Sequence, residues 1–256
     1  MSKSIEDSLR QLMYWAGHGI EKIIGKVQKA KVSVVARPGV QPILSLESQL
    51  ALDKIQDLIA FAIERFYLPV IPHLEGKSCL EIGAGKPVFA TQFLQKQAKA
   101  MITVNTGYGE SPIQGDASRG FIVKAETHNL PFENDFFDYT AARLASSAQK
   151  DILNTIKEIT RTLSPGGQGV FIDFHPFGLY AKKGPQRLLS LESNIKGLED
   201  YYKICRTAGL RIMNIKEAFI DEGLRSKFSQ SEIQTYRNIK GTPLIIFVFF
   251  FKPKVK

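Results

Sequence analysis

The stretch CLEIGAGKPVFATQFL, residues 79–94, decides the fold of this chain. Its first residues predict a buried strand that ends at Glu81-Ile82, and the glycines at 83 and 85 predict a tight loop that leads directly into a helix. Glycines let a backbone approach a ligand closely, and the amide groups at a helix N-terminus favour an anionic group. The stretch therefore predicts either a ligand-binding loop or only a tight strand-to-helix turn, and Pro87 suits both.

Short apolar runs alternate with helical stretches around and after this loop. Seven runs predict strands: SCLEI, AMITVN, GFIVKA, FFDYTAA, GVFIDF, RIMNIKEAF and LIIFVFFF. Such alternation indicates a parallel sheet covered by helices on both faces. The last two runs have no helix-length apolar pattern between them, so we expect them to pair antiparallel at an edge. The predicted fold class is α/β, with a doubly wound seven-stranded sheet that is mostly parallel and has an antiparallel last strand pair.

Two helices are predicted on the N-terminal side of the sheet. Residues 5–27 have the apolar spacing of an amphipathic helix, and a second helix begins at Ser45 and ends before Pro69. The first helix is interpreted as docked on the domain, as a movable lid, or as a helix with weak contact to a membrane surface. We therefore divide the chain into an N-terminal helical cap, residues 1–75, and a main domain, residues 76–256.

The composition excludes several classes of protein. The longest apolar run, Leu244 to Phe251, is far shorter than the roughly 20 residues that span a bilayer. The N-terminal segment has acidic residues where a signal peptide needs an apolar core. The only cysteines, Cys79 and Cys205, lie in a predicted strand and a predicted helix, which favours reduced core thiols over a disulfide framework. We therefore expect a cytoplasmic location.

The net charge of +9 is concentrated in the last third of the chain. Residues 180–256 carry 15 basic and 7 acidic side chains, whereas residues 76–179 carry 10 of each. A basic surface can attract nucleic acid, anionic lipid or an acidic substrate, although a solvated charged face is the commoner explanation. No interleaved aromatic platform accompanies these charges, which argues against nucleic acid and leaves an anionic acceptor or surface.

The acidic residue before the glycine loop resembles the first motif of a known family. A dinucleotide site would favour GxGxxG with no acid there, whereas Glu81 precedes GAG. The chain resembles the class I S-adenosylmethionine-dependent methyltransferases between Lys77 and Pro253. Further motifs lie in NLPFENDFFDYTAA, EITRTLSPGGQGVFIDF and the closing helix and strand pair, LEDYYKICRTAGLRIMNIKEAF with KGTPLIIFVFFFKP. The resemblance implies a Rossmann-like sheet.

The resemblance also implies S-adenosyl-L-methionine as the cofactor and identifies residues that bind it. Those matching the family's motifs are Glu81, Gly83, Ala84, Gly85, Asn105, Glu126 and Thr127. Glu81 and the glycines match the site for the methionine end. Asn105 stands where the family has an acid for the ribose hydroxyls, and its amide can still form hydrogen bonds. Glu126 matches the acid that receives the adenine amine, with Thr127 beside the ring.

Methyl transfer depends mainly on in-line alignment of the acceptor and exclusion of water. If the acceptor carries a proton, His175 after the fifth strand is the candidate general base, or else it positions the loop before Pro176. Arg143 after the fourth strand is a candidate for binding the acceptor, or it faces solvent. Tyr14 in the predicted cap is a second acceptor-binding candidate, or it only packs. No metal site is expected.

The function implied by the resemblance is transfer of a methyl group to a small-molecule or lipid-like acceptor. The segment AARLASS follows the fourth strand where relatives that methylate bases carry N-P-P-Y, which argues against a nucleic-acid base as acceptor. Pro87 replaces the family's third glycine, and the loop TGYGESPIQGDASRG replaces a helix. These departures leave open an alternative, a non-catalytic or weakly active binding module that retains the cofactor as a ligand.

Overall fold

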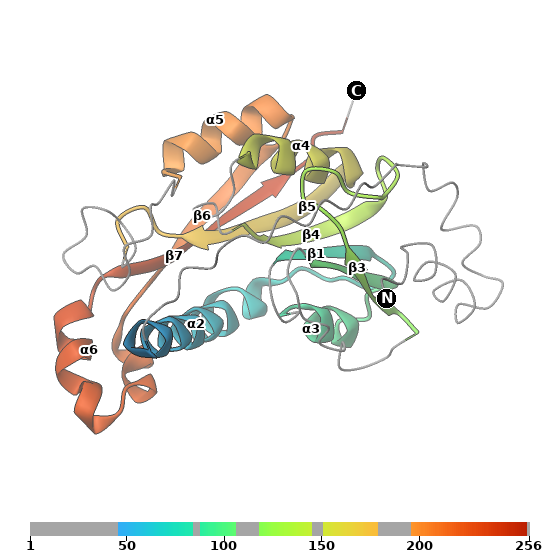
Figure 1. The fold of residues 1–256 in the computed structure, drawn as a ribbon. Helices are drawn as coiled ribbons and strands as arrows, with labels where there is room; N and C mark the ends of the chain where they lie inside the picture. Colours follow the sequence, from blue (N-terminus) through green and yellow to red (C-terminus); the bar gives the residue numbers. More distant parts are fainter. Residues whose placement is uncertain (1–45, 84–87, 106–117, 145–150, 179–195, 255–256) are drawn as a thin grey trace.

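The computed structural model describes residues 46–83, 88–105, 118–144, 151–178 and 196–254. They form a seven-stranded sheet in the order β3-β2-β1-β4-β5-β7-β6 (Figure 1). The strands are β1 (Ser78–Gly83), β2 (Ala100–Asn105), β3 (Gly120–Lys124), β4 (Phe137–Arg143), β5 (Leu163–Phe174), β6 (Arg211–Phe219) and β7 (Pro243–Phe251). All neighbouring pairs from β3 to β5 are parallel, whereas β7 is antiparallel to both β5 and β6. The predicted α/β fold with an antiparallel last strand pair is confirmed.

Helices cover both faces of the sheet (Figure 1). On one face lie α4 (Ile152–Thr162) and α5 (Leu198–Ala208), and on the other lie α2 (Leu46–Phe66) and α3 (Ala90–Gln95). Each face has its own apolar core: Ile55 of α2 and Phe93 of α3 belong to one, and Ile156 of α4 and Tyr201 of α5 belong to the other. The predicted second N-terminal helix therefore forms and packs directly on the sheet. The first predicted helix, residues 5–27, lies outside the described residues, and the boundary at residue 75 stays a prediction.

The apolar run at the end of the chain forms β7, which lies between β5 and β6 in the sheet. Side chains of β7 enter the apolar cores on both faces of the sheet, with Phe247 in one core and Ile246 and Val248 in the other, which explains why Leu244 to Val248 are fully buried. Within the sheet, the Phe250 ring stacks on Phe171 of β5 with centroids 4.1 Å apart. The run is thus a central strand, as its length of eight apolar residues indicates.

The link between β6 and β7 contains short helical segments, although its sequence has no helix-length apolar pattern. The chain forms two 3-10 turns, η3 (Glu222–Lys227) and η4 (Gln230–Glu232), and the helix α6 (Ile233–Ile239). Ion pairs tie this link to α2, with Lys54 Nζ 2.9 Å from Glu232 Oε2 and Arg65 Nη1 2.6 Å from Asp221 Oδ1. These segments are too short to show a helical apolar period in the sequence, and their packing against α2 stabilises them.

The register of the parallel strands brings several chain segments to one edge. Gly83 lies beside Asn105, Asn105 lies beside Lys124, and Ile82 lies beside Ala142. The carboxyl ends of β1, β2, β3 and β4 therefore meet at the same edge of the sheet.

Among the helices of the described residues, none is both long enough and apolar enough to cross a bilayer.

Candidate functional site

The strand order places the candidate site where the connections change direction. β1 is followed along the chain by β2 on one side, while β4 pairs with β1 on the other. In open α/β sheets, ligands bind outside the carboxyl ends of the strands at such a switch point. The loop predicted from residues 79–94 leaves β1 at this point, although its residues 84–87 lie outside the described part of the chain.

Glu81 is completely buried at the end of β1 and faces the start of α3. The backbone N–H of Val88 donates to Glu81 Oε1 at 2.7 Å, and that of Phe89 donates to Oε2 at 3.2 Å. The Thr103 hydroxyl of β2 donates to Oε2 at 3.5 Å. Burial raises the pKa of Glu81 above its ordinary value, although the Arg143 charge and these amides act in the opposite direction. The carboxylate is therefore held in place by its own chain.

Arg143 from the end of β4 reaches back over the end of β1. Its Nη2 lies 3.8 Å from Glu81 Oε1, and its side chain is 24% exposed. A Cβ added at Gly83 would lie only 2.9 Å from the same Nη2, so the guanidinium rests directly on the glycine backbone. Burial lowers the pKa of Arg143 from its ordinary value, and Glu81 opposes this shift. The structure thus groups Glu81, Gly83 and Arg143, and the sequence could not show this because it does not reveal which strands are neighbours.

The predicted adenine-side residues lie on the segment that follows β3. Glu126 is exposed, and its carbonyl accepts from the backbone N–H of Asn129 at 3.1 Å. Thr127 is buried, and its hydroxyl shares a 3.0 Å hydrogen bond with the hydroxyl of Thr155 on α4. The hydrogen bond between Thr127 and Thr155 thus attaches this segment to α4, while Glu126 remains accessible.

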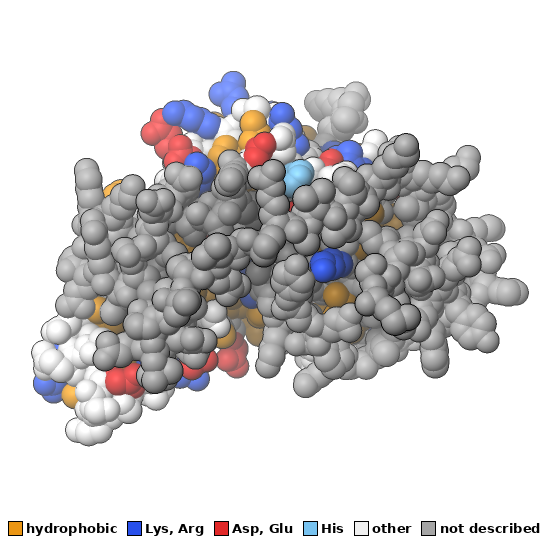
Figure 2. Space-filling view, viewed as in Figure 1, with side chains coloured by type: hydrophobic (Ala, Val, Ile, Leu, Met, Phe, Trp, Pro, Cys, Tyr) orange, Lys and Arg blue, Asp and Glu red, His pale blue; other side chains and the backbone are white. Residues whose placement is uncertain are grey.

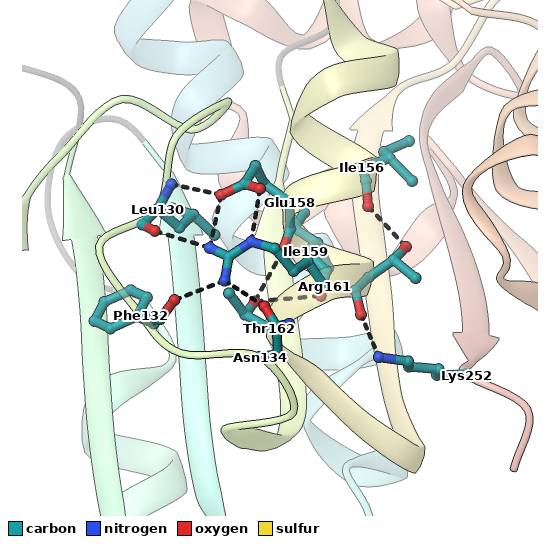
Figure 3. A network of polar contacts seen from close by, with 10 residues as sticks. Leu130, Phe132, Asn134, Ile156, Glu158, Ile159, Arg161, Thr162 and Lys252 are labelled. Atoms are coloured by element: carbon teal, nitrogen blue, oxygen red, sulfur yellow. Dashed lines mark hydrogen bonds and ion pairs between the residues drawn. The ribbon is translucent and has the colours of Figure 1, made fainter. Parts of the chain in front are cut away.

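A polar network on α4 holds the same segment further along (Figure 3). Glu158 Oε2 accepts from the backbone N–H of Leu130 at 2.8 Å, and Arg161 donates to the carbonyls of Leu130 at 2.9 Å and Phe132 at 2.7 Å. Partial burial opposes the shift, but the hydrogen bonds from Arg161 and Leu130 lower the pKa of Glu158. The sequence indicated no role for Glu158 or Arg161, although Arg161 lies in the motif EITRTLSPGGQGVFIDF.

His175 directly follows β5 and is 4% exposed. Its Nε2 lies 2.7 Å from Glu217 Oε1 of β6, and its Nδ1 accepts from the backbone N–H of Phe177 at 3.1 Å. A ring nitrogen that accepts from an N–H carries no proton, so Nε2 carries the proton and donates it to Glu217. Both ring nitrogens are therefore engaged. His175 could serve as a base only after Nδ1 leaves Phe177.

The remaining predicted residues are only partly described. Asn105 ends β2 beside Gly83, and nothing is described of its side chain. Tyr14, Ala84 and Gly85 lie outside the described residues. Within the described ranges no group of three His, Cys, Asp or Glu side chains could hold a metal ion. A cavity of 230 Å³ is lined by Tyr139, Gly169, Phe249 and neighbouring side chains, none of them a predicted site residue.

Comparisons with known proteins agree with this fold. Residues 80–171 match the family model of a methyltransferase domain. The fold is similar to an S-adenosylmethionine-dependent methyltransferase from Mesorhizobium loti, with 14% identity, a TM-score of 0.55, and coverage of 75% of this chain and 98% of that one. It is similar to geranyl diphosphate methyltransferase in complex with S-adenosylmethionine, with 16% identity, a TM-score of 0.53, and coverage of 83% and 93%.

A third similar structure is named for a different reaction. It is the [4+2]-cyclase SpnF, with 14% identity, a TM-score of 0.51, and coverage of 95% of this chain and 94% of that one. No curated protein matches the sequence. At these identities the solved structures show the fold, and the family model covers the segment that contains Glu81, Glu126 and Arg143.

Proposed function

We propose that this chain, a class I S-adenosylmethionine-dependent methyltransferase, transfers the methyl group to a small-molecule or lipid-like acceptor by in-line displacement. The observation that carries the proposal is the buried Glu81 at the switch point of the sheet, with Gly83 and Arg143 beside it. Open α/β sheets bind ligands outside the carboxyl ends of their strands, at such a switch point.

The proposal assigns the cofactor's three parts to residues in order along the sheet edge. In the proposed arrangement Glu81 takes the methionine amino group, Asn105 at the end of β2 takes the ribose hydroxyls, and the exposed Glu126 takes the adenine amine. Gly83 supports the fit, because it keeps the backbone bare where a side chain would fill the space beside Arg143. When bound, the cofactor supplies a methyl group on a positively charged sulfur, which is already strongly electrophilic.

The chain's own contribution in this proposal is to align the acceptor and accept a proton. His175 is the proposed base, because it follows β5 at the carboxyl edge of the sheet. Its hydrogen bonds require the proton to be taken at Nδ1, since Nε2 already carries the proton that Glu217 holds. Base catalysis by His175 therefore includes release of the Phe177 backbone.

A small or lipid-like acceptor is supported by neighbouring folds and by the charges on one face of the molecule. One neighbour is named as a geranyl diphosphate methyltransferase, which acts on an acceptor that combines an apolar chain with anionic phosphates. Figure 2 shows that the described charged side chains over α5 have both signs, and α5 exposes Glu199, Asp200, Lys203 and Arg206. Interleaved charges of this kind do not form the single-sign basic patch that nucleic-acid binding requires.

The two cysteines support the proposal of a cytoplasmic location. Cys79 and Cys205 are both free and buried. Burial raises the pKa of each thiol to about 12, which keeps the thiols protonated and unreactive. Two unreactive thiols suit a reducing compartment.

The experiment that tests the proposal is titration calorimetry of the full chain with S-adenosylmethionine and S-adenosylhomocysteine. The assay is followed by measurement of S-adenosylhomocysteine release with a panel of allylic diphosphates, fatty acids and phenols. Binding together with acceptor-dependent release is the expected result. Binding of both ligands without release of S-adenosylhomocysteine in the presence of any acceptor would favour the non-catalytic binding module. No binding of either ligand at millimolar concentrations would overturn both the methyltransferase and the binding-module hypotheses.

A further inference from the structure

Glu81 and Arg143 form a charge pair that is matched to an α-amino acid. We propose that Arg143 binds the carboxylate of the cofactor's methionine end while Glu81 binds its amino group, so that Arg143 belongs to the cofactor site and not to the acceptor site. This inference rests on the proposed function, and it adds a residue that selects for the amino-acid part of the ligand.

The geometry of the sheet brings the two side chains to one place. Glu81 of β1 lies beside Ala141 of β4 in the register, and Arg143 is two residues further along the same strand. Because side chains two apart on a strand share a face, Glu81, Gly83 and Arg143 point to the face that α2 and α3 cover. The backbone of Gly83 lies against the Arg143 guanidinium on this face.

The distance between the charges leaves the pair open to exchange. Nη2 of Arg143 and Oε1 of Glu81 are 3.8 Å apart, which is an ion pair but longer than a direct hydrogen bond. A ligand carboxylate can form two parallel hydrogen bonds with a guanidinium at 2.7 to about 2.9 Å. Such a fork would be shorter than the distance between Arg143 and Glu81.

Charge balance explains why an amino acid suits the site. Glu81 is completely buried and Arg143 largely so, and a buried charge is costly unless it is paired. A ligand with only a carboxylate would draw Arg143 away and leave Glu81 with neutral hydrogen-bond donors but no cationic partner. An amino acid brings one charge of each sign, so both protein charges keep a partner. The pair therefore discriminates in favour of a zwitterion.

The test compares two ligands that differ only in the amino-acid part. S-adenosylhomocysteine carries it, and 5′-methylthioadenosine lacks it. We expect Arg143→Gln to raise the dissociation constant for S-adenosylhomocysteine by about 10- to 100-fold, as for loss of a hydrogen bond to a charged group, and to leave that for 5′-methylthioadenosine within twofold. Arg143→Lys keeps the charge but not the fork, so it should give an intermediate loss for S-adenosylhomocysteine alone.

Two further variants make the result specific. Arg65→Gln removes an arginine that pairs with Asp221 in the link between β6 and β7, and both ligands should bind as to the wild type. Glu126→Gln should weaken the binding of both ligands, because both carry adenine. Circular dichroism melts show whether each variant is folded, and Arg143→Lys replaces Arg143→Gln if the latter is not.

The outcomes separate this inference from the proposed function. If the wild type binds both ligands and the Arg143 variants bind S-adenosylhomocysteine as tightly as the wild type, the inference is overturned and the proposed function stands. Equal losses for both ligands would also overturn it, because they would indicate general damage to the site. If the wild type binds neither ligand, the proposed function and the inference fail together.

Discussion

Arg161 on α4 donates a hydrogen bond at 2.9 Å to the carbonyl of Leu130, which lies 31 positions earlier in the chain. The same guanidinium also reaches the Phe132 carbonyl and the Glu158 carboxylate. Leu130 closes the segment that begins at Glu126, so α4 sets the position of the proposed adenine-binding acid. We therefore expect Arg161 to influence ligand affinity, although it lies outside the proposed ligand site.

We expect Arg161→Ala to weaken cofactor binding as well as stability. Loss of hydrogen bonds from a charged group should lower the free energy of unfolding by about 1 to 3 kcal/mol. It should also raise the dissociation constant for 5′-methylthioadenosine by about tenfold, because ordering the segment would cost about 1.4 kcal/mol of binding energy. Chemical denaturation and calorimetry measure the two effects.

Lys252 offers a matched control for this prediction. Its ammonium binds the carbonyls of Thr160 and Leu163 and the Asp135 carboxylate, at 2.6 to 2.8 Å, on the other side of α4. Lys252→Met should lower stability to a similar extent without changing ligand affinity. If both variants lost affinity equally, the effect would come from general loosening of α4 and not from the Leu130 segment.

Glu81 is expected to affect the fold as well as the ligand. Its carboxylate accepts from the amides of Val88 and Phe89 and pairs with Arg143, so Glu81→Ala leaves a buried cation and two amides without their acceptor. Removal of one partner from a buried ion pair costs about 3 to 5 kcal/mol. We therefore expect Glu81→Ala to lose cofactor binding and a large part of its stability, as thermal unfolding will show.

The double variant Glu81→Gln/Arg143→Gln separates the two effects. It removes both charges together and keeps side chains that can form hydrogen bonds, so its stability should be closer to that of the wild type than the stability of either single variant. Its affinity for S-adenosylhomocysteine should stay low. A double variant that binds S-adenosylhomocysteine like the wild type would show that neither charge contacts the ligand.

Burial of Cys79 and Cys205 predicts a loss of stability at alkaline pH. In the folded chain the pKa of each thiol is raised to about 12 from an ordinary value of 9.0. Between pH 9 and pH 12 the folded state therefore holds thiol protons that the unfolded state has lost. Because the folded state binds more protons in this range, the free energy of unfolding falls as pH rises through it, and the contribution is fully present below pH 9.

Urea denaturation at pH 8 to 10 measures this dependence. Cys79→Ala and Cys205→Ala should each reduce the slope of stability against pH above 9, whatever their effect at pH 8. The native thiols should also react slowly with a disulfide reagent at pH 8, and rapidly in urea. An unchanged slope in both variants, or rapid reaction of the folded protein, would contradict the prediction.

The sequence predicted the strands more completely than the contacts of the site. The strands were recognisable because each is a short apolar run, and Glu81 was recognisable because it lies near the end of one of them, two residues before the first glycine of the loop. The pairing of Glu81 with Arg143 depends on β1 lying beside β4, which the order of the strands in the chain does not reveal. His175 and Glu217 are likewise brought together only by the antiparallel strand pair, and the ion pair between Lys54 of α2 and Glu232, just before α6, could not be inferred from the sequence.

The hydrogen bonds of His175 predict one tautomer of its ring. Nδ1 accepts from the Phe177 amide and Nε2 lies 2.7 Å from the Glu217 carboxylate, so the proton should be on Nε2. Nitrogen chemical shifts of the labelled protein at pH 8 distinguish the two tautomers. A proton on Nδ1 would contradict this arrangement and would also remove the nitrogen at which we propose that the acceptor's proton is taken.

Two substitutions separate a catalytic role of His175 from a role in positioning the chain. The amide of His175→Gln can replace Nε2 and donate to Glu217, and the oxygen of His175→Asn can replace Nδ1 and accept from Phe177, but neither amide is a base. If His175 is the base, both variants should bind S-adenosylhomocysteine normally and lose about 100-fold or more in turnover on an acceptor that carries a proton. If His175 only positions the segment after β5, the variant that retains the more important hydrogen bond should keep turnover close to that of the wild type, and the other should lose stability.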